Sequence, residues 1–290
     1  MINSGNKLAL KILVAILFCI VIFTATFLFL SENQEPQNDF VSFLSVGQGD
    51  STIIHSNGYT ALIDTGTPMS GLTVAKELRK CGINRVDVMI LTHPHDDHIG
   101  GAEYLIEEMA IGSMVLSNVL PNDDDNAQCL NYLKQSASAK QIKCYTATEG
   151  MVINIGNFEL TVLMSDDSAK EENDTSIIIM AKNGENKFLL TGDAEAATER
   201  KLIKENINFD CDVLKVGHHG SNTSSVAEFL EIASPEYAVI SVGKDNSYGH
   251  PHSDVLSRLA LVNANVLRTD TYGSVMFQII DGKIALKQWV

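Results

Sequence analysis

The chain has 290 residues, of which 45% are hydrophobic and 20% are charged. This composition suits one or two folded domains and excludes a disordered or low-complexity chain. The formal net charge of −15 excludes a nucleic-acid-binding protein that relies on a broad positive surface, so an anionic substrate would need a local positive group such as a metal ion. The five cysteines form no CxxC pair, so neither a disulfide framework nor a cysteine-based metal site is expected.

The N-terminal region contains a long apolar segment. Residues 12–30 carry no charge, no proline and no glycine. About 20 apolar residues are needed to cross the hydrocarbon core of a bilayer, which is about 30 Å thick. A cleaved signal peptide is the alternative, but its hydrophobic region is usually only about 7–15 residues long. We therefore expect a single transmembrane helix over residues 12–30.

Charges on either side of this segment predict its orientation. Lys7 and Lys11 precede it, whereas acidic residues follow it. The positive-inside rule then places residues 1–11 in the cytoplasm and the rest of the chain outside the cell membrane. Residues 31–38 are polar and are expected to link the membrane span to a single extracytoplasmic domain, residues 39–290.

Short β-branched runs alternate with helical patterns through this domain, which predicts an α/β fold with mixed sheets. Residues 123–125, three consecutive aspartates, are interpreted as a solvated loop. In chain order, strands are predicted at residues 40–46, 52–55, 59–64, 86–91, 114–117, 158–164, 176–181, 187–190, 212–216, 237–242 and 275–279, and helices at residues 73–81, 98–109, 127–140, 194–205, 225–232 and 254–260.

A cluster of metal-binding side chains follows the predicted strand at residues 86–91. The spacing H-x-H-x-D-H is made by His93, His95, Asp97 and His98. Imidazole nitrogens and carboxylate oxygens are the ligands of zinc and manganese hydrolase sites. His93 and His95 would share one metal, and Asp97 and His98 would face a second ion about 3.5–4 Å away. A polar loop with incidental histidines is a poor alternative, because so many metal ligands rarely coincide in six positions.

This motif resembles the metal-binding signature of the metallo-β-lactamase superfamily. The resemblance implies an αββα sandwich with its metals at one edge of the two sheets. It also implies that Asp64, which ends a strand, holds the metal loop in place, and that Asp193 bridges the two metals. Either His218 or His219 should bind the second metal, and we favour His219, with His218 donating to the substrate.

Four further stretches resemble the hydrolase domain of the ComEC family of competence DNA-uptake proteins: residues 43–50, 217–224, 241–251 and 268–270. The sequence departs from these relatives at Ser45, which replaces an aspartate. It also lacks the histidine that the superfamily places between His98 and Asp193, where Asn173-Asp-Thr-Ser176 occurs instead. The first metal is therefore expected to have fewer nitrogen ligands or an oxygen ligand, which makes Mn²⁺ as plausible as Zn²⁺.

Together these features predict a membrane-anchored extracytoplasmic hydrolase that holds two divalent cations, Zn²⁺ or Mn²⁺. A hydroxide bridging the metals would attack a phosphodiester, with single-stranded DNA as a candidate partner. Alternatives are a hydrolase of a β-lactam or of a cell-wall phosphodiester, and a non-catalytic DNA-binding domain.

Individual roles follow from the resemblance. The expected metal ligands are His93, His95, Asp97, His98, Asp193 and His219, and the expected catalytic residues are Asp97, Asp193, His218 and His250. Lys215, Ser221 and Ser224 are candidates for substrate binding. Each of these three has a structural alternative, because a lysine at a strand edge and serines at a helix N-terminus are common in any fold.

Overall fold

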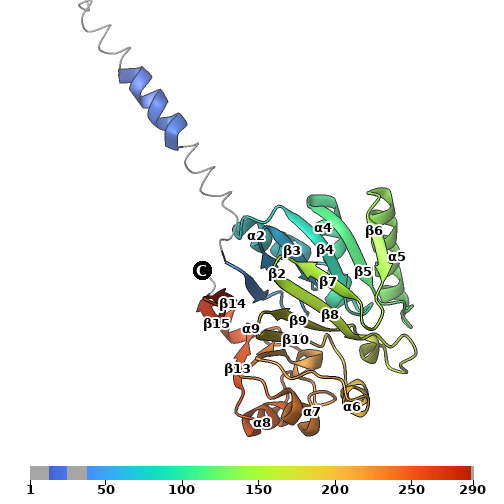
Figure 1. Cartoon of the computed structure of the whole chain (residues 1–290). Helices are drawn as coiled ribbons and strands as arrows, with labels where there is room; N and C mark the ends of the chain where they lie inside the picture. The colour runs from blue at the N-terminus through green and yellow to red at the C-terminus, as the bar shows by residue number, and fades with distance from the viewer. Residues whose placement is uncertain (1–12, 25–37, 289–290) are drawn as a thin grey trace, which may run out of the picture.

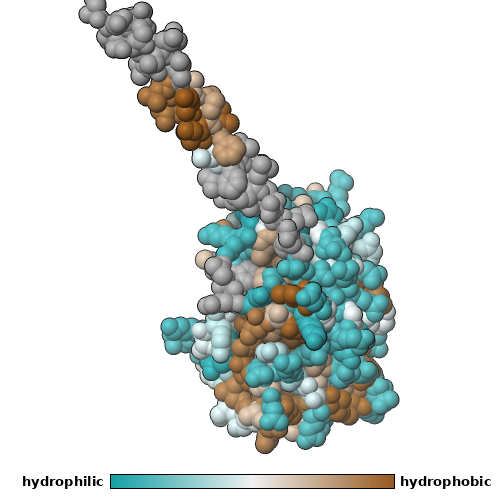
Figure 2. All heavy atoms as spheres, turned by 60° about the vertical axis from the view of Figure 1, so that its left-hand side comes forward, coloured by the Kyte–Doolittle hydropathy of each residue, from teal (hydrophilic) through white to brown (hydrophobic). Residues whose placement is uncertain are grey.

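The computed structural model describes residues 13–24 and 38–288. Residues 13–24 are helical, and their apolar side chains are exposed (brown in Figure 2). Within the two described ranges, no helix combines the length and apolarity needed to cross a membrane. The remainder of the predicted span, the predicted cytoplasmic residues 1–11 and nearly all of the predicted linker lie outside the described residues.

The first sheet has eight strands and contains both ends of the domain (Figure 1). Its outer strand at one end belongs to the C-terminal hairpin, which pairs antiparallel with the first strand of the domain. In spatial order the strands are β15 (Lys283–Gln288), β14 (Val275–Ile280), β1 (Phe40–Phe43), β2 (Thr52–Ser56), β3 (Tyr59–Ile63), β4 (Arg85–Leu91), β5 (Ala110–Leu116) and β6 (Lys143–Thr146).

The second sheet has seven strands and is built from the second half of the chain. Four consecutive strands at one side of it are parallel. In spatial order the strands are β13 (Asn265–Arg268), β12 (Tyr237–Ile240), β11 (Val213–Lys215), β10 (Asn186–Leu190), β9 (Ile178–Asn183), β8 (Phe158–Met164) and β7 (Val152–Ile155).

Helices cover the outer face of each sheet (Figure 1). Against the first sheet lie α2 (Gly71–Lys80), α4 (Ala102–Glu108) and α5 (Asp124–Ala139). Against the second lie α6 (Ala196–Lys204), α7 (Ala227–Ala233) and α8 (Ser253–Leu261). Short elements near the sheet ends are α3 (Asp96–Ile99), α9 (Thr269–Tyr272) and the 3₁₀ turns η1 (Glu172–Thr175) and η2 (Gly217–Gly220).

Three apolar layers hold this arrangement together, and the side-chain alternation of the strands explains them. In β10, Phe188 and Leu190 face the other sheet, whereas Leu189 between them packs against the helices. Val88 and Ile90 of β4 also face the space between the sheets, and Met89 faces the helices. Successive strand residues point to opposite faces, so strands buried on both sides are apolar throughout. The predicted αββα sandwich is confirmed.

Some local predictions need correction. The predicted helix over 98–109 is two short helices, α3 and α4, separated by Gly100 and Gly101. A Cβ at Gly100 would lie 2.3 Å from the Asp96 carbonyl oxygen, so only glycine fits this close turn. The predicted acidic loop also begins a helix, because the Asp123 side chain accepts a hydrogen bond from Asn126 N and caps α5.

Candidate metal centre

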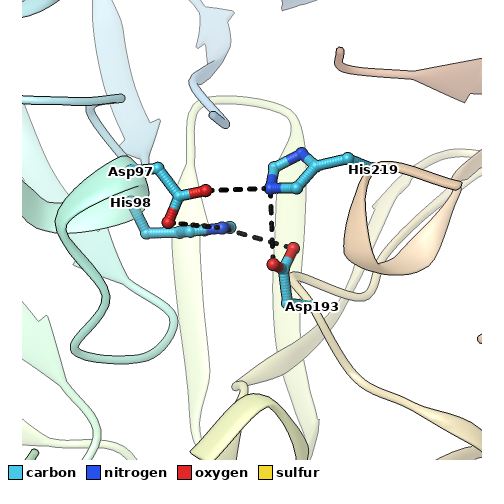
Figure 3. A group of neighbouring side chains, drawn as sticks. All are labelled: Asp97, His98, Asp193 and His219. Atoms are coloured by element: carbon cyan, nitrogen blue, oxygen red, sulfur yellow. Dashed lines mark hydrogen bonds and ion pairs between the residues drawn. The ribbon is translucent and has the colours of Figure 1, made fainter. Parts of the chain in front are cut away.

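Segments that follow three strands meet at one edge of the sandwich. Asp97 and His98 lie in α3, which follows β4 of the first sheet. Asp193 follows β10 and His219 follows β11, which are parallel neighbours in the second sheet. Because the carboxyl ends of parallel strands share an edge, residues far apart in sequence converge there. Figure 3 shows the four side chains pointing toward a common centre.

The distances among these four side chains suit a bound cation. His219 Nε2 lies 3.2 Å from Asp97 Oδ2 and 3.3 Å from Asp193 Oδ2. His98 Nε2 lies 3.2 Å from Asp193 Oδ1 and 3.9 Å from Asp97 Oδ1. One ligand atom from each residue can be chosen so that all four lie within 4.8 Å of one another. Such spacings are those between ligands that surround one ion at about 2.0–2.2 Å.

The unused hydrogen-bonding capacity of these atoms also fits a metal. His98 Nε2 and Asp193 Oδ1 are buried and lack a hydrogen-bond partner, although they are only 3.2 Å apart. Their approach therefore lacks the alignment of a hydrogen bond. Buried polar atoms without partners are rare and costly in native proteins, and a metal ion would satisfy both.

Groups behind the cluster aim both imidazole rings. His98 Nδ1 lies 2.8 Å from Asp64 Oδ2, and the Asp64 carboxylate also accepts bonds from the Thr92 amide and hydroxyl. His219 Nδ1 donates to the Ser241 carbonyl oxygen at 2.9 Å. Each Nδ1–H is thus engaged away from the cluster, which leaves Nε2 to bind a metal. Asp64 occupies the supporting position that the resemblance implied.

The charges in the cluster perturb its ionisation strongly. Burial alone would lower the pKa of His219, but Asp193, Asp50 and Asp97 together outweigh burial and raise that pKa to about 10. Burial would raise the pKa of Asp193, but His219 and His98 hold it well below its usual range. The pKa of His98 is likewise raised by Asp193 and Asp64 against the effect of burial. Without metal, the cluster therefore retains protons that a cation must displace.

His93 and His95 lie beside this cluster but do not join it. The His93 ring is 4.1 Å from the His98 ring and 4.5 Å from the His95 ring, centre to centre. Burial and the neighbouring His98 lower the pKa of His93, and its Nε2 has no hydrogen-bond partner. In the described part of the chain, neither histidine belongs to a set of three His or acidic ligands within 4.8 Å.

The Asn173–Ser176 element does reach the site, where the superfamily would place its missing histidine. Ser176 Oγ lies 3.3 Å from His93 Nδ1 and accepts a hydrogen bond from the Asp193 amide at 3.0 Å. Asn173 lines the pocket above the cluster, and its Oδ1 is buried without a partner. This element therefore brings a serine oxygen and an asparagine side chain to the site.

A pocket of about 430 Å³ opens above the cluster. It is bounded by residues of both sheets, and its lining is mostly polar. The lining residues are Gln48, Thr67, His95, Asp96, Asp97, Asn126, Asn173, Asp193, His218, His219, Tyr248 and His250.

His218 and His219 have opposite surroundings, although they are adjacent in sequence. Both have left-handed backbone angles, with φ of 47° and 52°. This turn buries His219 in the cluster and leaves His218 at the pocket wall. His218 Nδ1 lies 3.0 Å from Glu195 Oε1, which also accepts a hydrogen bond from Thr223 Oγ1 at 3.0 Å. The hydrogen bond from His218 lowers the pKa of Glu195.

His250 lies at the pocket wall beside the other histidines. Burial and the nearby His218 lower the pKa of His250 to about 4, so its ring is neutral at neutral pH. Its Nδ1 is buried and has no hydrogen-bond partner. It can therefore accept or donate a hydrogen bond to a bound molecule, but it cannot supply a positive charge there.

The structure corrects the predicted substrate contacts of Lys215, Ser221 and Ser224. Lys215 is 2% exposed, and its ammonium group pairs with Asp50 Oδ2 at 2.7 Å. Ser224 is fully buried and donates to the carbonyl oxygen of Gly217. Ser221 is also buried, with its hydroxyl 3.0 Å from that of Thr223. All three side chains have internal partners and lie outside the pocket lining.

Other residues of the site were not assigned a role from the sequence. Asp50 lies beneath the cluster, with Oδ1 3.6 Å from His219 Nδ1. Glu195 contacts His218 at the pocket wall, and Tyr248 lines the pocket. Asp50 and Tyr248 occur in stretches that resemble the ComEC family, and Glu195 follows Asp193 by two positions. Proximity to these motifs was the available signal, but it did not indicate where the side chains point.

The family comparison agrees with this geometry. A model of the metallo-β-lactamase superfamily matches residues 44–147 and 170–244. ComE operon protein 3 of Bacillus subtilis (strain 168) is 31% identical over 258 residues, covering 82% of this chain and 33% of that protein. Recombination protein 2 of Haemophilus influenzae (strain ATCC 51907 / DSM 11121 / KW20 / Rd) is 30% identical over 276 residues, covering 93% and 32%.

This chain thus spans about a third of the length of these curated relatives. Among solved structures, the metallo-β-lactamase fold protein YhfI from Bacillus subtilis matches with a TM-score of 0.55 and 14% identity. The match covers 82% of this chain and 100% of that one. At this identity the match supports the fold alone.

Proposed function

Because the chain belongs to the metallo-β-lactamase superfamily, we propose that it is a metal-dependent hydrolase whose substrates are phosphodiesters. The observation that carries this proposal is the convergence of Asp97, His98, Asp193 and His219, with partnerless buried atoms, on the floor of a polar pocket. The choice of phosphodiesters is supported by relatives named as a ComE operon protein and a recombination protein, because recombination acts on DNA.

The four residues of the cluster would hold one divalent cation. A second cation would be held by His93 and His95 with Asp193, and Zn²⁺ and Mn²⁺ both suit such nitrogen and oxygen donors. When bound, such ions lower the pKa of coordinated water and polarise a phosphoryl oxygen. The net charge of −15 makes this local positive charge the main attraction for an anionic substrate.

The remaining pocket residues position the substrate and move protons. Glu195 accepts from Nδ1–H of His218, so Nε2 of the neutral ring presents a lone pair to the pocket. This nitrogen can take up a proton and then deliver it to a leaving-group oxygen. The neutral His250 and the side chain of Asn173 add polar contacts at the pocket wall. Since Asp97 and Asp193 remain ionised, they retain their capacity to bind cations at all physiological pH values.

The proposal can be tested with the full chain loaded with Mn²⁺ or Zn²⁺. Substrates should include a single-stranded oligonucleotide, bis-p-nitrophenyl phosphate and a chromogenic β-lactam. We expect hydrolysis of the phosphodiesters, and Asp193→Asn should abolish turnover and also weaken DNA binding, because it removes a ligand of the cations that attract the substrate. Hydrolysis of the β-lactam without any phosphodiester, across all metals tried, would overturn the substrate assignment.

We also propose that residues 12–30 anchor the chain in the cell membrane by a single span, with the hydrolase domain outside the cytoplasm. The uncharged sequence and the exposed apolar side chains of residues 13–24 support this. Protease added to intact cells, after any wall is removed, should then cut the domain. Complete protection beside a degraded exposed control protein would reverse the orientation.

A further inference from the structure

The rim of the pocket carries an aromatic side chain that has no structural role in the core. Tyr248 lies in the loop after β12 and is 65% exposed, yet it lines the pocket above the metal cluster. Exposing an aromatic ring to water forgoes the stabilisation that burial would provide, and aromatic rings commonly serve as contact surfaces for ligands. Tyr248 is therefore placed to contact whatever enters the pocket.

Three rings form a stack that leads from this rim to the cluster. The Tyr248 ring lies over the His250 ring with centres 5.6 Å apart and planes 24° apart. His250 in turn lies 6.4 Å from His219, with planes 27° apart. His219 Nε2 faces the cluster at 3.3 Å from Asp193. A flat group resting on Tyr248 would thus lie at the rim of the pocket whose floor holds the cluster.

The loop that carries Tyr248 is braced in this position. The Asn246 side chain donates to the carbonyl oxygens of Gly243 and His250 and accepts a hydrogen bond from the His250 amide. The Gly243 amide donates to Oε1 of Gln48, a residue of the loop between β1 and β2. A ring held in place before binding loses little conformational entropy when a ligand stacks on it.

The charge of the pocket narrows the class of ligand. The lining includes the carboxylates of Asp96, Asp97 and Asp193, and no lysine or arginine lines the pocket in the described part of the chain. A long polyanion would find no basic groove beside the site, so its phosphates cannot supply most of the affinity. Stacking of a neutral flat group would compensate, because it is insensitive to this negative surface.

We propose that Tyr248, stacked on His250, is a platform for a nucleobase of the substrate whose phosphodiester is cleaved at the cluster. The inference rests on the proposed phosphodiesterase function and specifies its substrate as a nucleotide-containing diester. Base–aromatic stacking tolerates any base, so the site would select for the presence of a base rather than for a sequence.

The test compares substrates with and without bases on the full, metal-loaded chain. Dithymidine monophosphate contains one phosphodiester and two bases, and its abasic analogue replaces both nucleosides with tetrahydrofuran residues. Tyr248→Ala should lower kcat/KM for the first by about 5- to 150-fold, which corresponds to about 1–3 kcal/mol per stacked base, mostly through KM. The same change should leave the already slow cleavage of the abasic analogue unaltered.

Two further variants separate stacking from other roles. Tyr248→Trp should retain most of the activity on dithymidine monophosphate, because it keeps an aromatic face. Tyr272→Ala is the matched control, because Tyr272 is also 65% exposed but lies outside the pocket lining. It should leave both activities unchanged, and thermal unfolding should confirm that all variants are folded.

Several outcomes would overturn the inference. An equal loss on both substrates, or no loss on either, would show that Tyr248 does not contact a base. A loss on a base-free sugar phosphodiester as large as that on dithymidine monophosphate would assign the ring to carbohydrate stacking instead. These results leave the proposed function standing, whereas a wild-type chain that cleaves no phosphodiester would remove both.

Discussion

Replacing Lys215 by methionine tests whether this lysine stabilises the fold or binds the substrate. The side chains of Lys215 and Asp50 are only 3% and 5% exposed, and the pair is closed at 2.7 Å. Lys215→Met removes the ammonium group and leaves a buried carboxylate whose other oxygen, Oδ1, already lacks a hydrogen-bond partner. Removing one member of a buried ion pair costs about 3–5 kcal/mol, so we expect a loss of that order in the free energy of unfolding.

Thermal and urea unfolding of the full chain would measure this loss. For a chain of this size, 1 kcal/mol shifts Tm by about 2–4 °C, so the expected decrease is on the order of 10 °C. Lys76→Met is the control, because Lys76 is exposed on α2 and its replacement should change stability by no more than about 0.5 kcal/mol. Adding Asp50→Asn to Lys215→Met should restore part of the stability, because no charge then remains buried.

The opposite pattern would refute this interpretation. If Lys215 bound substrate from a solvated position, Lys215→Met would leave Tm unchanged and raise KM. The paired change at Asp50 would then restore nothing.

Three other predictions follow from the geometry of the domain. Burial raises the pKa of Glu199 to about 7, so the protonated side chain contributes fully to stability below pH 4.5, and about 3 kcal/mol of the free energy of unfolding is lost as pH rises through 7. Glu199→Gln should make the free energy of unfolding, measured with urea, less dependent on pH over this range. An unchanged pH dependence would contradict the raised pKa of Glu199. Metal binding should displace protons from His98 and His219. The calorimetric heat of metal binding should therefore differ between buffers of different ionisation enthalpy. Equal heats in all buffers would argue against protonated histidines in the metal-free cluster. Gly49→Ala would place a Cβ 2.4 Å from the Asp97 carbonyl oxygen, so it should weaken metal affinity measured by competition with a chelator. Gly150→Ala is the control, because its Cβ would have no neighbour within 4 Å, and it should leave metal affinity unchanged. Equal affinities of the two variants would mean that the loop of Gly49 shifts without moving Asp97.

The fold was predictable from the sequence where burial is two-sided. Strands β4 and β10 are apolar over residues 88–91 and 188–190, because both faces of these stretches pack against other layers. The strands β6, β7, β13 and β15 were not predicted, and all four lie at or near the ends of their sheets. The four residues of β6 are exposed, so no apolar pattern marks it. Short edge strands are defined by pairing with a neighbour, which a local pattern does not reveal.

The members of the metal cluster that are close in sequence, or that directly follow an apolar strand, could be predicted from the sequence. The motif at residues 93–98, together with Asp193 and His219, supplied all four members of the observed cluster. The burial of Lys215 was not predicted, because a lysine in a short strand is usually an exposed edge residue and its partner Asp50 is distant in sequence. Glu195 and Tyr248 were missed for a similar reason, since their contacts with His218 and His250 depend on how separate loops fold together.

The left-handed turn at His218 and His219 gives the two histidines separate surroundings, so a substitution at one need not affect the other. One residue of the pair is buried against Asp97 and Asp193, and any replacement there would disturb the metal cluster. Its neighbour faces the pocket and is held only by side chains, chiefly Glu195. A substitution at His218 can therefore change how the leaving group is treated without altering the cluster beside it. Adjacent positions in one short turn are thus free to diverge independently, which offers a simple route from one substrate to another within the same scaffold.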